Sequence, residues 1–355
     1  MARRIRVLIV DDSVVIRRVL VHSIDAHDDM EVVGTASNGR IALDRIGIDR
    51  PDIIVLDVQM PEMDGLETLR QLRLRGSNIP VVMFSSLTRP EMQTTFDALE
   101  LGASDFVAKP IAKSPTNTIA HDLIPRLRAL TTRASRRPTP VLPKEITRTR
   151  PKAAGPASLI VVGASTGGPD ALQRLFGALP SDFTAPILVV VHMPAEFTPI
   201  FAERLRDTTA LAAKEADNGE HLRAGCVYIA PGNRHLEIER RGSGFCALVD
   251  DGPPENSCRP SVDVLFRSAA QVAGAESLGV VLTGMGRDGL AGARALRRAG
   301  AAVLVQDEAS SVVWGMPGFV ARQGLATSVR PVLEIATELS RRTRPPRLVA
   351  MGAEK

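Results

Sequence analysis

Short apolar runs alternate with amphipathic segments throughout the first 125 residues of the chain. The runs have the length of buried strands, and the segments between them repeat apolar residues at helical spacing. An alternation of this kind predicts a parallel sheet with helices on both faces, the doubly wound α/β class. The expected strands cover residues 7–10, 31–36, 53–57, 81–85 and 106–109, and the expected helices cover 14–20, 41–46, 66–74, 96–101 and 116–130.

Polar side chains lie at the ends of these expected strands. Asp11 and Asp12 follow the first strand, while the third, fourth and fifth end at Asp57, Ser85 and Lys109. The carboxyl ends of parallel strands share one edge of a sheet, so we expect these side chains to lie close together. Three carboxylates in one place repel each other unless a cation neutralises them, and oxygen ligands favour Mg²⁺. Considered singly, the first two aspartates also suit a helix N-cap, and the lysine a solvated loop.

Residues 159–170, Leu-Ile-Val-Val-Gly-Ala-Ser-Thr-Gly-Gly-Pro-Asp, indicate the start of a second α/β unit. The apolar beginning suits a buried strand, and the glycines suit a sharp turn that leads into a helix. Ser165 lies at the bend in the pattern Gly-x-Ser-x-Gly of a nucleophile elbow, where amides at the helix N-terminus face a developing oxyanion. A glycine-rich loop that binds a phosphate or a dinucleotide fits this stretch equally well.

His192 and Asp288 lie near the ends of two further expected strands, residues 186–191 and 279–283. An imidazole at the end of the second strand weakens the dinucleotide interpretation, which needs an acid there to bind the ribose. Strand-to-helix turns of a parallel sheet share one face, so Ser165, His192 and Asp288 can converge as nucleophile, general base and orienting acid. Each of the three alone also suits a helix cap or an ordinary loop position.

Composition limits the class of protein. A chain of 355 residues fits two domains, and three cysteines without C-x-x-C spacing indicate neither a disulfide framework nor a zinc site. Much of the net charge of +4 arises in residues 131–156, where seven Lys or Arg accompany one acid, Glu145. Few aromatic residues lie among the basic ones, which argues against nucleic-acid binding.

The chain divides at a segment without apolar periodicity. Residues 131–156 contain five prolines and are interpreted as a linker, which gives domains at 1–130 and 157–345 and a tail at 346–355. Both domains are expected to be doubly wound, mainly parallel sheets. The apolar run after the N-terminal arginines is too short for a signal peptide or a membrane span, so we expect a cytoplasmic protein without membrane insertion.

The acid pair, Asp57, Ser85 and Lys109, in that order, resemble the site of receiver domains in two-component response regulators. The resemblance implies that Asp57 accepts a phosphoryl group from a histidine kinase, with Mg²⁺ shielding the carboxylate from the incoming phosphate. Phe106 stands where many members carry a switch tyrosine, so ring packing would transmit the signal. The residues implied are Asp11, Asp12, Asp57 and the carbonyl of Gln59 for the metal, and Ser85 and Lys109 for the phosphoryl oxygens.

Residues 158–340 closely resemble chemotaxis protein-glutamate methylesterases, in which a receiver precedes the catalytic domain. The motifs that carry this resemblance are Gly-Ala-Ser-Thr-Gly-Gly at 163–168, His192-Met-Pro, Ala230-Pro-Gly with His235, Arg259-Pro-Ser-Val-Asp263 and Leu282-Thr-Gly-Met-Gly286. The resemblance implies phosphorylation-regulated hydrolysis of glutamate γ-methyl esters on methylated chemoreceptors, and deamidation of selected glutamines, by a Ser-His-Asp acyl-enzyme mechanism. It implies an oxyanion hole from the amides of Thr166 and Met285, and no cofactor in the catalytic domain.

Several alternatives stay open. A DNA-binding regulator would normally carry a short helical output domain, and a binding module without catalysis would not need the full Ser-His-Asp set. His235 and Arg259 are weaker candidates for the substrate groove, and Cys258 is interpreted as structural. A receiver fused to a hydrolase predicts that the unphosphorylated receiver limits access to the site, and recruitment to the signalling array is the alternative.

Overall fold

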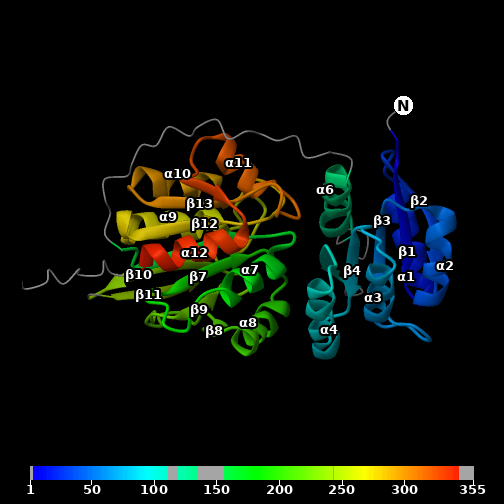
Figure 1. The fold of residues 1–355 in the computed structure, drawn as a ribbon, viewed down its shortest axis with the longest axis horizontal. Coiled ribbons are helices and arrows are strands. Elements are labelled where there is room, and N and C mark those ends of the chain that lie inside the picture. Colours follow the sequence, from blue (N-terminus) through cyan, green and yellow to red (C-terminus); the bar gives the residue numbers. More distant parts are fainter. Residues whose placement is uncertain (1–2, 111–118, 135–155, 243, 344–355) are drawn as a thin grey trace, which may run out of the picture.

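The computed structural model describes residues 3–110, 119–134, 156–242 and 244–343, which form two α/β units (Figure 1). The expected tail and residues 135–155 of the expected linker lie outside the described residues, so the domain boundaries stay predictions. Within the described residues, no helix has both the length and the apolar character that crossing a bilayer requires.

The first unit is a five-stranded parallel sheet in the order β2-β1-β3-β4-β5. Its elements are β1 (Ile5–Val10), α1 (Val14–Asp25), β2 (Met30–Ala36), α2 (Gly39–Asp49), β3 (Ile53–Asp57), α3 (Gly65–Leu74), β4 (Val81–Ser85), α4 (Arg89–Glu100), β5 (Asp105–Ala108), the π-helical turn η1 (Ile119–Leu123) and α6 (Ile124–Ala134). Ser13, Asn38 and Asp64 cap α1, α2 and α3, because each side chain accepts a hydrogen bond from the backbone N–H three residues later. The sheet confirms the predicted doubly wound class.

The second unit is a seven-stranded parallel sheet in the order β14-β13-β12-β6-β7-β9-β8, so its predicted class is also confirmed. Its strands are β6 (Leu159–Ala164), β7 (Ile187–Val191), β8 (Ala212–Glu215), β9 (Cys226–Ile229), β12 (Ser277–Val281), β13 (Ala302–Gln306) and β14 (Ser328–Arg330), and β10 (His235–Arg241) and β11 (Gly244–Asp250) form a separate antiparallel hairpin. Its helices are α7 (Gly168–Gly177), α8 (Phe197–Thr208), α9 (Val262–Val272), the 3₁₀ turn η2 (Gly274–Glu276), α10 (Leu290–Arg298), α11 (Met316–Arg322) and α12 (Val332–Thr343).

Strand β6 lies at the centre of the second sheet and is buried along its whole length. It pairs with β12 on one side and with β7 on the other. The chain order reverses across β6, which makes the carboxyl end of this strand a topological switch point, the place where open α/β sheets form their sites. The turn after β6 contains Ser165.

Several helices are longer than the sequence analysis expected, among them α1, which continues to Asp25, and α2, which covers Gly39–Asp49. Helix α4 begins at Arg89, well before residue 96, because Pro90 occupies its first turn, where a missing N–H has no cost. Helix α6 continues to Ala134, beyond the expected end at 130. The β10–β11 hairpin was not expected, and it packs against α9.

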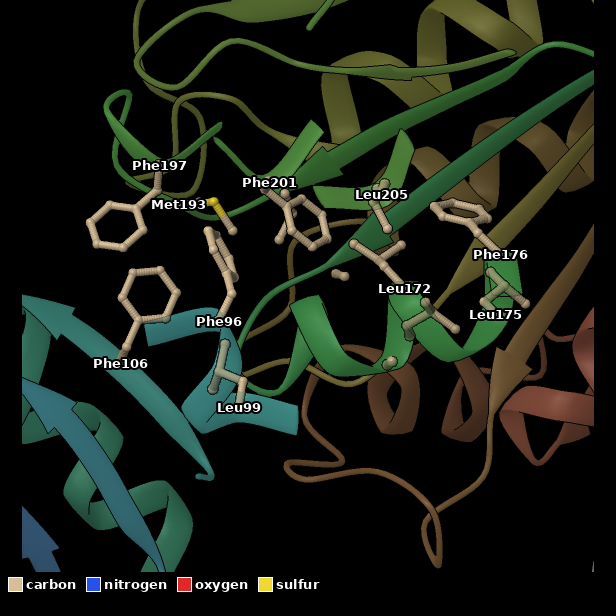
Figure 2. Packing of buried hydrophobic residues seen from close by; sticks show 14 of the residues in the cluster. Phe96, Leu99, Phe106, Leu172, Leu175, Phe176, Met193, Phe197, Phe201 and Leu205 are labelled. Carbon is tan, nitrogen blue, oxygen red and sulfur yellow. The ribbon is translucent and has the colours of Figure 1, made fainter. Parts of the chain in front are cut away.

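An aromatic cluster joins the two units. Phe96 of α4 stacks on Phe201 of α8 with ring centroids 5.4 Å apart, and Phe106 of β5 lies 4.5 Å from Phe197. Figure 2 shows these four rings packed together, with Met193 beside them. The side chains are buried, so the contact removes apolar surface of both units from water.

Polar contacts surround this cluster. Arg204 of α8 donates to Asp97 at 2.7 Å and pairs with Glu100 at 2.8 Å, and both acids belong to α4. Arg89 forms a further pair with Glu203. The first unit therefore lies with α4 and β5 against the second unit.

We expect the core of the second unit to depend on fully buried aromatic rings. Phe266→Ala on α9 should lower the free energy of unfolding of this unit by about 3–5 kcal/mol, because it removes apolar burial and leaves a cavity. Phe319→Ala is the matched control, since that ring is 39% exposed, and should cost below about 1 kcal/mol. Urea titration of both variants measures the difference, and equal losses would contradict this account of the core.

Candidate active site and phosphorylation site

Ser165 lies in a tight turn between β6 and α7. Its N–H donates to the carbonyl of Thr283 at 3.0 Å, and its carbonyl accepts from Gly168 at 2.5 Å. Gly167 has φ of 73°, a left-handed conformation that favours glycine, and begins the helix. A Cβ on Gly284 would lie 2.8 Å from the Ser165 Cβ, so a glycine there lets the neighbouring turn approach the serine.

His192 and Asp288 reach the same edge of the sheet from two other turns. His192 directly follows β7, and Asp288 lies in the loop between β12 and α10. The His192 Nε2 donates to Asp288 Oδ2 at 2.9 Å, although the two residues are 96 positions apart. The structure therefore joins the predicted base and the predicted orienting acid directly.

The Asp288 carboxylate is 3% exposed and held by an unusual number of donors. It does not cap the helix that follows it, as the simplest sequence interpretation suggests, but the N-terminus of α9. The donors besides His192 are the N–H groups of Val262 at 2.7 Å, Asp263 at 3.0 Å and Gly289 at 3.0 Å, the Ser261 hydroxyl at 2.8 Å and the Asn256 amide at 3.3 Å. Such donors fix both carboxylate oxygens and stabilise the charged form.

These contacts move the pKa values of the pair in opposite directions. Burial alone would raise the pKa of Asp288, but the hydrogen bonds from His192 and the α9 backbone outweigh it and hold the pKa at about 2. Burial alone would lower the pKa of His192, but Asp288 and the neighbouring Cys258 raise it to about 9. The pair is thus an ionised acid beside a strongly basic imidazole.

Because Asp288 accepts the Nε2 proton, the other ring nitrogen of His192 faces the rest of the site. Ser165 lines the same cavity, but within the described part of the chain no hydrogen bond joins its hydroxyl to His192. The Nδ1 atom instead lies 3.9 Å from the sulfur of Cys258. Cys258 is therefore part of the site and not only structural, a position that nothing in the local sequence indicated.

A cavity of about 860 Å³ contains the three candidate catalytic residues and opens between the two units. Thr166, Met285 and Arg259 line it from the second unit, and Asp105, Phe106 and Arg126 are among the residues that line it from the first unit. His235 lies outside the lining residues, since its ring accepts from Ser261 N–H and contacts the Pro253 carbonyl. Arg259 donates to Asn233 and to loop carbonyls, which fixes its guanidinium at the rim.

The predicted acid cluster forms at the carboxyl edge of the receiver sheet. Lys109 Nζ lies 2.7 Å from Asp57 Oδ1 and 3.0 Å from Asp11 Oδ2. Ligand atoms of Asp11, Asp12 and Asp57 come within 4.8 Å of one another, and Asp12 is exposed. Gln59 is also exposed, two residues after Asp57.

The donor set of this cluster fits a hard divalent cation. Asp11 Oδ2 and Asp57 Oδ1 are buried, and among the described residues they accept no hydrogen bond of good geometry, although both touch the Lys109 ammonium. Burial and the Asp11 charge raise the pKa of Asp57 to about 7 despite that ammonium. Carboxylate oxygens with unused lone pairs are suitable Mg²⁺ ligands.

Ser85 lies beside the acid cluster, because its carbonyl accepts from the Lys109 N–H at 2.6 Å, whereas the Phe106 ring faces the other unit. The buried Ser85 hydroxyl accepts from Thr95 at 2.9 Å and donates to the Ser86 carbonyl at 3.1 Å. Phe106 points toward the second unit, where its ring packs on Phe197 (Figure 2). The structure therefore brings Asp57, Asp11 and Lys109 into direct contact. The Ser85 side chain contacts α4, and the Phe106 ring contacts the other unit.

Sequence reasoning missed the residues that hold the catalytic groups. Asn256 bridges the Asp288 and Asp263 carboxylates, and Gln306 accepts the Thr283 N–H beside the serine turn. Their amides have no periodicity or motif that indicates such a role. Ser261 directly precedes α9, and a serine at the start of a helix is the one local signal that could have pointed to such a role.

Comparison with known proteins identifies the family. The CheB methylesterase family model matches residues 160–339, and the response regulator receiver domain model matches residues 7–119. A Nocardioides sp. protein named protein-glutamate methylesterase/protein-glutamine glutaminase is 46% identical over 363 residues, which covers 98% of this chain and 99% of that protein. A protein of the same name from Trichodesmium erythraeum is 43% identical and covers 96% and 99%.

A solved structure supports the same assignment. The crystal structure of the Thermotoga maritima CheB methylesterase catalytic domain is 39% identical, covers 52% of this chain and 98% of that chain, and superposes with a TM-score of 0.51. The matched parts contain the acid cluster of the first unit and the Ser165, His192 and Asp288 turns of the second. This chain therefore belongs to the CheB methylesterase family and carries a response regulator receiver domain before its catalytic domain.

Proposed function

We propose that this protein hydrolyses γ-methyl esters of glutamate on chemoreceptors, and deamidates selected receptor glutamines, through an acyl-enzyme on Ser165. The hydrogen bond between His192 and Asp288, in turns beside the serine turn, is the observation that carries the proposal. The names of the relatives contain both activities, and the two reactions share one chemistry, acyl transfer to water.

In the proposed mechanism, His192 moves protons through Nδ1, because Asp288 holds Nε2. Ser165 Oγ attacks the ester carbonyl and gives its proton to Nδ1, and the imidazolium then gives this proton to the methoxy oxygen, which leaves as methanol when its bond to the acyl carbon breaks. For glutamine the leaving group is ammonia. Water then loses a proton to the same nitrogen and cleaves the acyl-serine, which yields the glutamate carboxylate and restores Ser165.

Two backbone amides are suited to stabilise the oxyanion. Thr166 lies at the N-terminal side of α7, and Met285 lies between Gly284 and Gly286, whose φ of 84° turns the chain. Both residues line the cavity with Ser165. Donors fixed in advance stabilise the developing negative charge without reorganising during the reaction.

We assign phosphorylation to Asp57, with a histidine kinase as donor. Mg²⁺ would be held by Asp12, Asp57 and the Gln59 carbonyl, with support from Asp11, and when bound it neutralises charge on the incoming phosphoryl group. Lys109 and Ser85 are placed to bind phosphoryl oxygens at the same edge. Since the kinase draws on ATP, we expect the reaction to take place in the cytoplasm.

The position of the receiver supports inhibition of the unphosphorylated enzyme. Asp105 and Arg126 form a 3.0 Å pair that borders the cavity opposite Ser165, where a receptor helix would have to enter. Burial raises the pKa of Asp105, and the charge of Arg126 partly offsets this. A receiver held in this place excludes a large substrate, even though small molecules can enter a cavity of about 860 Å³.

A short route connects the phosphorylation site with the interface. Ser85 is hydrogen-bonded to Thr95 on α4, and the next residue, Phe96, packs on Phe197 and Phe201. A phosphoryl oxygen that accepts the Ser85 hydroxyl proton displaces the Ser86 carbonyl from it, which favours movement of the turn that leads into α4. A shift of about 1.4 kcal/mol in the balance of closed and open forms changes their ratio tenfold.

The catalytic assignment predicts large losses from single substitutions. Ser165→Ala should reduce methanol release from methyl-labelled receptor by about 10⁶-fold, because the nucleophile is removed. Asp288→Asn should reduce it by up to ~10⁴-fold, because His192 then lacks the carboxylate that fixes its tautomer and stabilises its charged form. Asp263→Asn is the matched control, since this buried carboxylate does not touch His192. It should stay within roughly tenfold of the wild-type rate. Near-normal turnover of folded Ser165→Ala would exclude the serine mechanism.

The raised pKa of His192 predicts the pH dependence. A protonated imidazole cannot accept the serine proton, so activity is lost as pH falls below a pKa of about 9. We expect kcat/KM to rise across the neutral range and to level off above that value, after subtraction of spontaneous ester hydrolysis. Asp288→Asn should move the midpoint down, because the carboxylate that stabilises imidazolium is gone. A wild-type midpoint near 6.5, the ordinary histidine value, would contradict this electrostatic account.

The interface can be tested by charge reversal. Arg204→Glu opposes Asp97 and Glu100, so without phosphodonor it should release methanol at least about tenfold faster than wild type. Arg206→Glu on the same helix is the control, because that side chain pairs only with the adjacent Asp207 in the described structure.

Adding Glu100→Arg to Arg204→Glu should restore inhibition by exchanging the charges. An Arg204→Glu enzyme that is no faster than unphosphorylated wild type would favour the alternative in which phosphorylation acts by recruitment to the array.

A further inference from the structure

The cavity contains a thiol that the proposed mechanism does not use. Cys258 Sγ lies 3.9 Å from His192 Nδ1 and makes a long contact of 3.5 Å with the Asn256 carbonyl. Cys226 and Cys246 are buried, whereas Cys258 is partly exposed and lines the cavity with the histidine. A sulfur and an imidazole nitrogen therefore face each other in a space that solutes can enter.

The hydrogen bond between His192 Nε2 and Asp288 makes the other ring nitrogen, Nδ1, a suitable metal ligand. Asp288 accepts the Nε2 proton at 2.9 Å, which leaves the lone pair on Nδ1. Histidine ligands of metal ions commonly donate their second N–H to a carboxylate in this way, and that partner fixes the tautomer and raises the basicity of the ligand. Asp288 is itself fully engaged by the α9 backbone and Ser261, so it acts behind the histidine and not as a ligand.

The separation of the two atoms suits a tetrahedral ion. Zinc bonds of about 2.3 Å to sulfur and about 2.0–2.1 Å to nitrogen place two such ligands roughly 3.6 Å apart at the tetrahedral angle. The 3.9 Å between Cys258 Sγ and His192 Nδ1 exceeds this by only about 0.3 Å, so a slight approach of the Cys258 side chain would complete the geometry. The cavity leaves room for water, or for the Ser165 hydroxyl, at the two remaining positions.

We propose that Cys258 Sγ and His192 Nδ1 form an inhibitory binding site for a thiophilic divalent cation of the Zn²⁺ class. Binding releases the thiol proton, and also the imidazole proton where Nδ1 carries one. The ion then occupies the lone pair that the general base needs, so Ser165 cannot be deprotonated. Inhibition is reversed when a chelator removes the ion.

Two other clusters in the described residues compete for metal ions and must be separated from this one. Asp11, Asp12 and Asp57 offer only oxygen, which favours Mg²⁺, and excess Mg²⁺ saturates them. Cys246 Sγ lies 3.2 Å from His221 Nδ1, but Cys246, a residue of β11, is fully buried. That second pair provides a matched control of the same chemistry.

Cobalt binding tests the site independently of enzymatic activity. Full-length protein in excess Mg²⁺ is titrated with Co²⁺, and a thiolate-to-cobalt charge-transfer absorption is expected for wild type and for Cys246→Ser. Cys258→Ser and Cys258→Ala should each lose this absorption while circular dichroism shows a folded protein. Using two replacements keeps the test decisive if one variant fails to fold. Absorption that survives in a folded Cys258 variant, or that disappears in folded Cys246→Ser, would overturn the assignment.

Zinc inhibition of phosphodonor-activated enzyme tests the consequence. Each variant is compared with its own zinc-free rate of methanol release, and half-inhibition of Cys258→Ser should need at least tenfold more Zn²⁺ than wild type. The zinc experiment rests on the proposed function, because it measures methanol release. The cobalt absorption does not depend on that function, so the binding test stays valid if the protein shows no esterase activity. Cobalt absorption together with equal zinc sensitivity of both proteins would overturn the inhibitory role.

Discussion

The buried carboxylate of Asp288 is the constraint on which the catalytic unit depends. One side chain accepts hydrogen bonds from His192, from the first N–H groups of α9 and from Ser261, so it joins the ends of β7 and β12 to a helix on the sheet. An unpaired charge at such a depth would be costly, whereas here each oxygen has donors. The contacts that set the charge and tautomer of His192 therefore also hold the turns after β7 and β12 against the N-terminus of α9.

Much of the fold was predictable because strands and helices have periodic sequences. The strand ends of a parallel sheet converge by topology alone, which explains why Ser165, His192 and Asp288 could be brought together from sequence. Asn256 and Cys258 could not, because they belong to an irregular loop whose path depends on contacts with Asp263 and the α9 terminus. Irregular loops have no periodic sequence pattern from which such contacts could be predicted.

The aromatic interface was beyond sequence reasoning for a different reason. Phe106 was expected to transmit the signal by ring packing, but its sequence position does not show which rings it meets, and Phe96, Phe197 and Phe201 have the spacing of ordinary core residues. Only the docking of two separately folded units shows that these rings meet each other, with Arg204 and the α4 acids at their edge. Apolar periodicity reports which side chains avoid water and not which unit covers them.

Residues of the receiver and of the catalytic unit line the same cavity. Under the proposed inhibition, Asp105 and Arg126 occupy the place where a receptor helix would lie, so receiver and substrate would compete for the same face of the catalytic unit. Binding of either partner would then be subject to mass action, with the tether setting the local concentration of the receiver. A dense receptor array would shift this competition toward substrate, so the packing of receptors in the membrane would influence the enzyme alongside its phosphorylation.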